Sequence, residues 1–204
     1  AKNALDLYAE LFYPYPRKTL SLVSADFLHN METDGMLLIS KGVIDFYRDA
    51  PLNNLTILVP HEISHQWFYS LVGNDPAKGP WLDETIATYC ESLYFERYHP
   101  EHLAWWWSNR VDGFKPEGWV NATIYIPGGY SAYRDAVYLN GAKFMQELRN
   151  LTGDDAFFAA LRQYTLQNTY KIASESDFFK ALRNHSTADL NPLLQRYFEN
   201  PPAY

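Results

Sequence analysis

Residues 59–68 read VPHEISHQWF, and the two histidines in this stretch, His61 and His65, lie four positions apart. On an α-helix of about 3.6 residues per turn, that spacing places both side chains on one face, one turn apart. Two imidazoles on one face can bind the same metal ion. Glu62 follows the first histidine, where its carboxylate can accept a proton from a metal-bound water molecule without binding the metal. The motif H-E-x-x-H therefore predicts a hydrolytic metal site, and the alternative is a helix that holds these residues by chance.

A catalytic zinc site has three protein ligands and keeps a fourth position open. The segment WLDETIATYCE, residues 81–91, offers the carboxylates of Asp83, Glu84 and Glu91. Glu84 follows His65 after eighteen intervening residues, a length that suits the end of one helix, a loop and the start of a second helix. Glu84 is thus the candidate third ligand, and the alternative is a solvated surface carboxylate. Glu91, about two turns further on, is placed either to hydrogen-bond a zinc-binding imidazole or to form a surface ion pair.

The composition is that of a globular protein with a hydrophobic core. Of 204 residues, 47% are apolar and 20% are charged, which argues against disorder. The formal net charge is −7 and the sequence has no Lys/Arg cluster, so nucleic acid is not an expected partner. No apolar run reaches the length of a membrane span, about 20 residues. Cys90 is the single cysteine, which excludes an intrachain disulfide and a thiol-only zinc site.

Hydrophobic periodicity predicts an α+β, mainly α fold, with a small N-terminal sheet followed by helices in one domain. Pro60 is expected to begin or kink the motif-bearing helix, and Ser174 or Ser176 to cap a later one. The expected elements are a helix over 3–12, strands over 18–26 and 36–40 with a polar turn at 29–35 between them, helices over 53–71 and 82–98, a short helix mixed with loop over 101–130, and helices over 131–151, 155–168, 176–184 and 188–199.

Taken together, these motifs resemble the signature of the gluzincin metallopeptidases of the aminopeptidase N family. That family has HExxH, eighteen residues and then Glu within WLNEG, and this chain has HEISH, eighteen residues and Glu84 within WLDET. The family has a Gly-Ala-Met-Glu-Asn strand upstream, and residues 29–35, HNMETDG, retain its glutamate as Glu32. Downstream, YLNGA begins with Tyr138, the tyrosine of the family's Y-x-K-G-A, with Asn140 in place of lysine. The resemblance spans essentially the whole chain and implies a thermolysin-like catalytic domain.

This resemblance implies a zinc centre in which the chain's own residues have distinct roles. Glu62 would be the general base that activates water. Tyr138 would donate a hydrogen bond to the oxyanion that develops in the transition state, and Tyr133, five residues earlier, is a second candidate for that role. One zinc ion per chain would be bound by three ligands, His61, His65 and Glu84.

Glu32 corresponds to the family glutamate that binds the free α-amino group of the substrate. A carboxylate at that point would place the ammonium so that only the first peptide bond reaches the metal, which makes an exopeptidase. His29 and Asn30 replace the family's Gly-Ala, and Thr33 replaces its Asn. These departures predict an altered cleft and looser specificity.

The expected function is zinc-dependent release of N-terminal residues from peptides with a free N-terminus. One alternative is a zinc endopeptidase of thermolysin-like build that does not use the substrate amine. Another is a catalytically weak scaffold domain of the same fold. Because the chain begins without methionine and matches only the catalytic part of the family pattern, we expect residues 1–204 to be a single catalytic domain excised from a longer chain, which packs against other domains.

Overall fold

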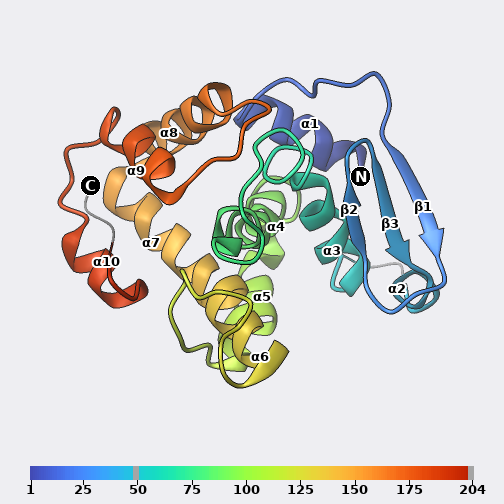
Figure 1. Ribbon diagram of the computed structural model, residues 1–204. Coiled ribbons are helices and arrows are strands. Elements are labelled where there is room, and N and C mark those ends of the chain that lie inside the picture. Colours follow the sequence, from blue (N-terminus) through green and yellow to red (C-terminus); the bar gives the residue numbers. More distant parts are fainter. Residues whose placement is uncertain (48–50, 202–204) are drawn as a thin grey trace.

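The computed structural model describes residues 1–47 and 51–201, and it has a small sheet beside a mainly helical body (Figure 1). This is the fold class predicted from the sequence. The elements in chain order are α1 (Lys2–Leu11), β1 (Ser21–Ala25), β2 (Met31–Thr33), β3 (Met36–Ser40), α2 (Lys41–Asp45), α3 (Asn54–Ser64), α4 (Glu84–Tyr98), α5 (Leu103–Trp106), α6 (Gly129–Tyr133), α7 (Gly141–Thr152), α8 (Asp154–Gln167), α9 (Glu175–Arg183) and α10 (Asn191–Tyr197).

The three strands form one mixed sheet in the order β1-β3-β2 (Figure 1). β1 runs parallel to β3, and β2 runs antiparallel to it with Glu32 opposite Leu37. The strand predicted over 18–26 is shorter than expected, whereas the one predicted over 36–40 has those bounds. Leu37 and Ile39 are buried, because residues two apart on a strand face the same side.

β2 lies inside residues 29–35, for which the sequence pattern predicted only a polar turn, so that prediction was wrong. Its three residues are too few to show strand alternation in the sequence. The turn that follows contains Gly35, whose φ of +76° suits glycine. Gln66 holds this hairpin, because its Nε2 donates to the carbonyl oxygen of Thr33 at 3.0 Å and its Oε1 accepts from the N–H of Gly35 at 2.9 Å. The β2–β3 hairpin is thereby fixed to the segment that follows α3.

α3 carries the H-E-x-x-H motif and begins close to where it was predicted. Asn53 caps the helix, because its side chain accepts a hydrogen bond from the backbone N–H of Thr56 at 3.0 Å. The helix runs through Pro60 and does not begin there. His61 therefore lies inside α3, and His65 is the C-cap residue with dihedral angles that are still helical (φ −64°, ψ −11°).

α3 ends at Ser64, seven residues before the end predicted from the sequence. Trp67 and Phe68 continue the helical spacing of apolar residues, but they reach the core from tight turns, in which the N–H of Val72 donates to the carbonyl oxygen of Trp67 at 2.8 Å. Tyr69 within these turns has φ of 139°, which is rare for a residue with a side chain. Apolar spacing does not distinguish a helix from turns that bury the same side chains.

α4 is the central helix of the molecule and begins at the candidate third ligand, Glu84, within the predicted range 82–98. Asp83 is its N-cap and accepts a hydrogen bond from the N–H of Glu84 at 2.6 Å. Ten of its fifteen residues are buried, because α4 packs against both α3 and α7. Cys90 is one of them and packs as a small apolar side chain.

The C-terminal half is helical, as predicted, with one revision. The helix predicted over 131–151 consists of α6, a π-helical segment at Arg134–Asn140, and α7. α8 and α9 agree with their predicted ranges within one residue at each end, and α10 is shorter than predicted. Ser174, one of the two predicted caps, forms a reciprocal capping box with Asp177 at the start of α9. The stretch 101–130 contains α5, short helical turns and loop, as expected.

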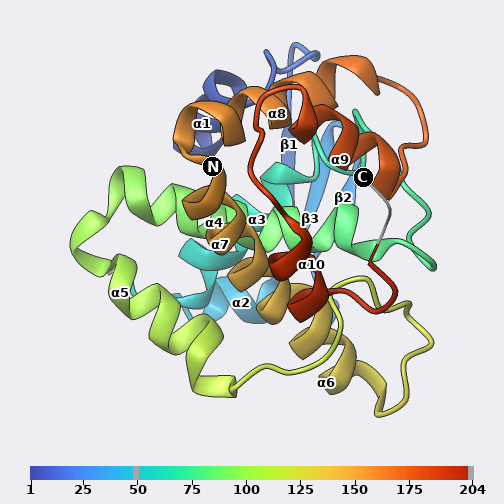
Figure 2. The ribbon, with the colours of Figure 1, turned by 90° about the vertical axis from the view of Figure 1, so that its left-hand side faces the viewer.

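α7 approaches α4 closely at Gly141 (Figure 2). A Cβ atom on Gly141 would lie 2.3 Å from Oγ1 of Thr85 on α4, so only glycine permits this approach. The contact places Tyr138, three residues before Gly141, beside the helix that carries Glu84.

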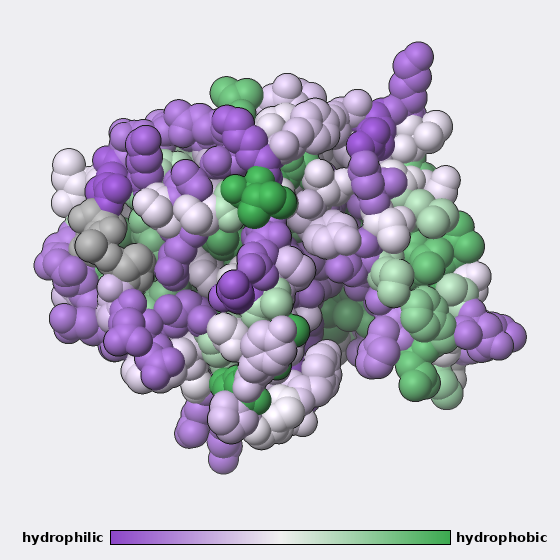
Figure 3. Space-filling view, viewed as in Figure 1, coloured by the Kyte–Doolittle hydropathy of each residue, from purple (hydrophilic) through white to green (hydrophobic). Residues whose placement is uncertain are grey.

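The surface differs between the two sides of the molecule. Apolar side chains gather over the sheet on the right-hand side of Figure 3, where Leu22 and Val23 of β1 are exposed. None of the helices in the described part of the chain combines the length and apolar character that a membrane crossing requires.

Candidate metal centre

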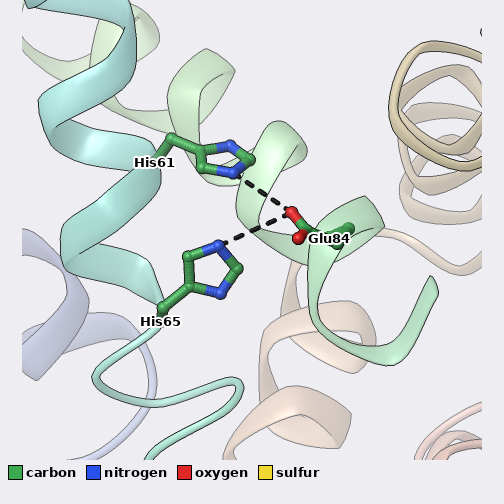
Figure 4. Close-up of side chains that lie close together, drawn as sticks. All are labelled: His61, His65 and Glu84. Carbon is green, nitrogen blue, oxygen red and sulfur yellow. Dashed lines mark ion pairs between the residues drawn. The ribbon is translucent and has the colours of Figure 1, made fainter. Parts of the chain in front are cut away.

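The side chains of His61, His65 and Glu84 converge between α3 and α4 (Figure 4). Oε2 of Glu84 lies 3.3 Å from Nε2 of His61 and 3.6 Å from Nε2 of His65. The two imidazole rings meet edge to face with their centroids 4.9 Å apart. The structure thus brings together the three residues that the sequence proposes as a ligand set.

Two of the three separations among these ligand atoms are close to the value expected around zinc. Two ligands at about 2.0–2.1 Å from a tetrahedral ion are about 3.3–3.4 Å apart, and the separations from Glu84 Oε2 to the two ring nitrogens are close to that value. Oε2 of Glu84 is buried and has no hydrogen-bond partner of normal geometry among residues 1–47 and 51–201. Its lone pairs are therefore available to a cation. Two imidazoles and a carboxylate are also donors that zinc favours, so the residues fit this ion.

The second ring nitrogen of each histidine has its own partner. Nδ1 of His61 lies 2.9 Å from Oε1 of Glu91, and Nδ1 of His65 lies 3.0 Å from the carbonyl oxygen of Phe68. Because both partners are acceptors, each Nδ1 carries a proton and donates it, which directs each Nε2 toward Glu84. Glu91 is fully buried, so it does not form an ion pair at the surface. Its carboxylate lies beside the imidazole of His61, which is the first of the two positions expected from the sequence.

The three candidate ligands perturb one another's pKa values. Burial would lower the pKa of both imidazoles, but the carboxylates beside them, above all that of Glu84, outweigh it and raise the pKa of His61 to about 9 and that of His65 to about 10. Burial would raise the pKa of Glu84, but the two histidines hold it well below its usual range. Glu84 is therefore ionised at neutral pH, as a zinc ligand must be.

Glu62 and Glu32 lie on one side of this ligand set. Three atoms lie within 4.8 Å of one another: one carboxylate oxygen of Glu62, one of Glu32 and a ring nitrogen of His65. Burial raises the pKa of Glu62, although the two histidines oppose that shift. A raised pKa makes this carboxylate a better proton acceptor near neutral pH. Glu32 is half-buried and reaches this position from β2.

Tyr138 lies in the π-helical segment and stacks on the ring of His61, with centroids 6.0 Å apart and planes 7° from parallel. Tyr133 meets Tyr138 edge-on, at 5.6 Å between centroids. Burial and the charge of Glu84 raise the pKa of Tyr138 well above its usual range. The hydroxyl of Tyr138 therefore keeps its proton at neutral pH and can donate a hydrogen bond.

One cavity of about 720 Å³ is lined by the three candidate ligands together with Glu32, Glu62 and Tyr138. Figure 3 shows a hollow between the sheet and the helices. This volume is in the range of about 300–1,000 Å³ that is typical of ligand sites. Arg110, Tyr130 and Arg134 also line the cavity, and none of them was predicted from the sequence. Arg134 lies four residues before Tyr138, and that helical spacing was a usable signal. Arg110 had no such signal in the sequence, because it lies in a stretch without a recognisable motif.

Comparisons with known proteins identify the family of this chain. The model of the peptidase family M1 domain matches residues 1–197. Aminopeptidase N of Lactobacillus helveticus is 26% identical over 98% of this chain and 26% of its own length. Endoplasmic reticulum aminopeptidase 1 of Homo sapiens is 25% identical over 93% of this chain and 22% of its own length. The chain thus spans about a quarter of the length of these curated relatives.

A solved structure shares the fold. The crystal structure of an M1 zinc metallopeptidase from Deinococcus radiodurans superposes with a TM-score of 0.75 at 24% identity, over 98% of this chain and 43% of that one. The family model extends over all but the last seven of the 204 residues. This chain therefore belongs to peptidase family M1.

Proposed function

We propose that this chain is the zinc-binding catalytic domain of an aminopeptidase. The observation that supports the proposal is the convergence of two imidazoles from α3 and one carboxylate from α4 at zinc-ligand separations, with Glu62 beside them. One zinc ion is bound per chain. Residues 1–204 form a single catalytic domain in this proposal, and the curated relatives are about four times longer, which supports packing against further domains.

His61, His65 and Glu84 would hold the zinc ion, which would supply a water of lowered pKa, about 7, and Lewis-acid polarisation of the scissile carbonyl. Glu62 accepts the proton of the attacking water and delivers it to the leaving amine. The hydroxyl of Tyr138 donates a hydrogen bond to the carbonyl oxygen as negative charge develops on that oxygen. Glu91 accepts the Nδ1 proton of His61 and so keeps that ring in the orientation in which Nε2 faces Glu84.

Glu32 supplies the preference for a free N-terminus in this proposal. Its carboxylate binds the α-ammonium group, so that the first peptide bond is the one that reaches Glu62 and the metal. The residues that depart from the family pattern beside it take part in hydrogen bonds, since the side chain of Asn30 accepts from the N–H of Ser40 at 2.9 Å and the carbonyl oxygen of Thr33 accepts from Gln66. Because Glu32 binds the α-ammonium group in this proposal, the substrates are peptides with a free N-terminus. Looser specificity remains a prediction.

Metal analysis of the purified protein and of Glu62→Gln tests the metal and the base separately. We expect about one zinc per chain in both, with kcat lowered about 10²–10⁴-fold in the variant because the proton acceptor is lost. Glu147→Gln, which removes a carboxylate remote from the cavity, should keep both zinc and activity. Wild-type protein without bound zinc would favour the scaffold alternative, and full activity in Glu62→Gln would reject the general-base role.

An amino-acid anilide with a free amine, compared with its N-acetylated form, distinguishes aminopeptidase from endopeptidase. The free form should be cleaved and the acetylated form should not, because only the ammonium can bind Glu32. Glu32→Gln should raise KM for the free form and leave zinc content unchanged. Equal cleavage of both forms would support an endopeptidase and remove Glu32 from its role.

A further inference from the structure

Glu91, on α4, takes part in hydrogen bonds through both carboxylate oxygens although it is fully buried. Its Oε1 lies 2.9 Å from Nδ1 of His61 and accepts from Nη2 of Arg110 at 2.9 Å. Its Oε2 accepts from Nε of Arg110 at 2.9 Å and from Nε1 of Trp106 at 3.1 Å. One carboxylate thus joins a candidate zinc ligand to two residues outside the metal motifs.

A carboxylate without solvent contact needs a compensating charge and donors for its lone pairs. Arg110 supplies both, because its guanidinium binds the two oxygens of Glu91 in bidentate geometry. A bidentate pair fixes the plane of the carboxylate as well as its position, which the single ammonium of a lysine does not. Arg110 therefore sets the plane of Glu91, and that plane directs Oε1 at His61.

Arg110 and Trp106 reach Glu91 from a different part of the chain than the zinc ligands. Trp106 is the last residue of α5, and Arg110 lies four residues later in the π-helical segment Trp107–Val111. Trp106 is buried, whereas the Arg110 side chain is 17% exposed and lines the cavity. Both residues lie where they can fix Glu91 without occupying the centre itself.

We propose that Arg110 is a positioning residue for the metal centre and that Trp106 assists it. Arg110 holds Glu91 so that Oε1 accepts the Nδ1 proton of His61, and this keeps Nε2 of His61 directed at Glu84. Loss of this contact leaves the His61 ring free to rotate away from the other ligands. The inference rests on the proposed function, because it assumes that this centre binds zinc.

The zinc dissociation constant of the purified protein, measured by competition with a chromophoric chelator, tests this role. We expect Arg110→Gln to weaken zinc binding about 10–100-fold, the range typical for loss of support to a ligating histidine. Arg110→Lys, which keeps the charge and loses the bidentate geometry, should lie between wild type and Arg110→Gln. Trp106→Phe removes only one donor and should have the smallest effect. At saturating zinc, KM for an amino-acid anilide should stay within about twofold of the wild-type value, because Arg110 does not bind substrate in this role.

Arg149→Gln is the matched control. Arg149 binds Glu96, on the same helix as Glu91, through two nitrogens at 2.7 and 2.9 Å. Its other partners are Asp154 and Tyr89, and neither lines the cavity. Both arginine variants should lower the melting temperature of the zinc-free protein, but only Arg110→Gln should change the zinc dissociation constant.

Wild-type zinc affinity in Arg110→Gln would overturn the proposal. An equal loss of affinity in Arg149→Gln would also overturn it, because the effect would then reflect general destabilisation. If Arg110→Gln does not fold, the other two variants decide. Wild-type zinc affinity in both Arg110→Lys and Trp106→Phe would then overturn the proposal. A wild-type protein that binds no stoichiometric zinc would instead reject the proposed function, so the two failures are distinguishable.

Discussion

The ring of Tyr138 lies parallel to that of His61, and its hydroxyl keeps its proton at neutral pH. We expect Tyr138→Phe to lower kcat about 10²–10³-fold, because one hydrogen-bond donor to the developing oxyanion is lost while the ring stays in place. KM and zinc content should change little. Steady-state kinetics with an amino-acid anilide, together with metal analysis, measure these quantities.

Tyr164→Phe is the control for this substitution. The hydroxyl of Tyr164 is also buried, and it has no hydrogen-bond partner in the described part of the chain. Its removal should leave kcat unchanged. A Tyr138→Phe enzyme that retains wild-type kcat would show that another group, such as Tyr133, stabilises the oxyanion.

Residue identities in the centre differ in how far the sequence reveals them. His61 and His65 are readable because a helix converts a four-residue spacing into proximity. Glu84 required the eighteen-residue spacing and the family resemblance, since a carboxylate has no distinctive local pattern. Arg110 could not be found in this way, because its contact with Glu91 depends on how α5 and the following π-helical segment fold back onto α4.

At the scale of elements, the helices were more predictable than their ends. α4, α8 and α9 begin and end within two residues of the expected positions. Pro100 follows the end of α4 and Ser174 caps α9, whereas α8 has no side-chain cap and its range followed from apolar spacing alone. The early end of α3 was not readable, since the turns after Ser64 bury the same apolar side chains that a longer helix would bury. The hydrophobic pattern missed β2, because a three-residue strand has no periodicity of its own and is defined by its pairing with β3. Only the family resemblance pointed to a strand at residues 29–35.

The capping box of α9 should contribute measurably to stability. We expect Ser174→Ala to lower the free energy of unfolding by about 1 kcal/mol at pH 7, the usual value for a lost N-cap. Hydrogen bonds from Ser174 lower the pKa of Asp177. A carboxyl with a lowered folded pKa stabilises the protein at pH values above its unfolded pKa of about 3.9, and this contribution is lost as the pH falls below it. The difference between wild type and variant should therefore shrink between pH 5 and about pH 3.

Denaturant unfolding at these pH values measures the effect. Ser176→Ala is the matched control, because Ser176 lies two residues further on, is exposed and does not cap the helix. It should leave the free energy of unfolding nearly unchanged at every pH. A penalty in Ser174→Ala that stays constant down to pH 3 would contradict the role of Asp177 in the capping box.

For the whole molecule, the candidate ligand set connects α3 to α4, so zinc should stabilise the folded chain. At a free zinc concentration about 100 times the dissociation constant, binding adds about 2.7 kcal/mol to the free energy of unfolding. For a chain of this size, that corresponds to a rise of about 5–10 °C in melting temperature. Thermal unfolding with added zinc and with a chelator measures this difference.

His65→Ala should melt at the same temperature with zinc and with the chelator, because a required ligand is missing. Arg149→Gln should keep the full zinc-dependent difference, since Arg149 lies outside the centre. A melting temperature of the wild type that does not respond to zinc would contradict the ligand assignment.

The position of the ligands on two different helices also has a kinetic consequence. Residues 66–83 separate His65 from Glu84, so the complete set exists only after α3 and α4 have packed together. We predict that these two helices pack late in folding, so that the ion binds tightly only after the transition state. Zinc should then lengthen the lifetime of the native state by slowing its opening, while the refolding rate stays the same with and without the ion.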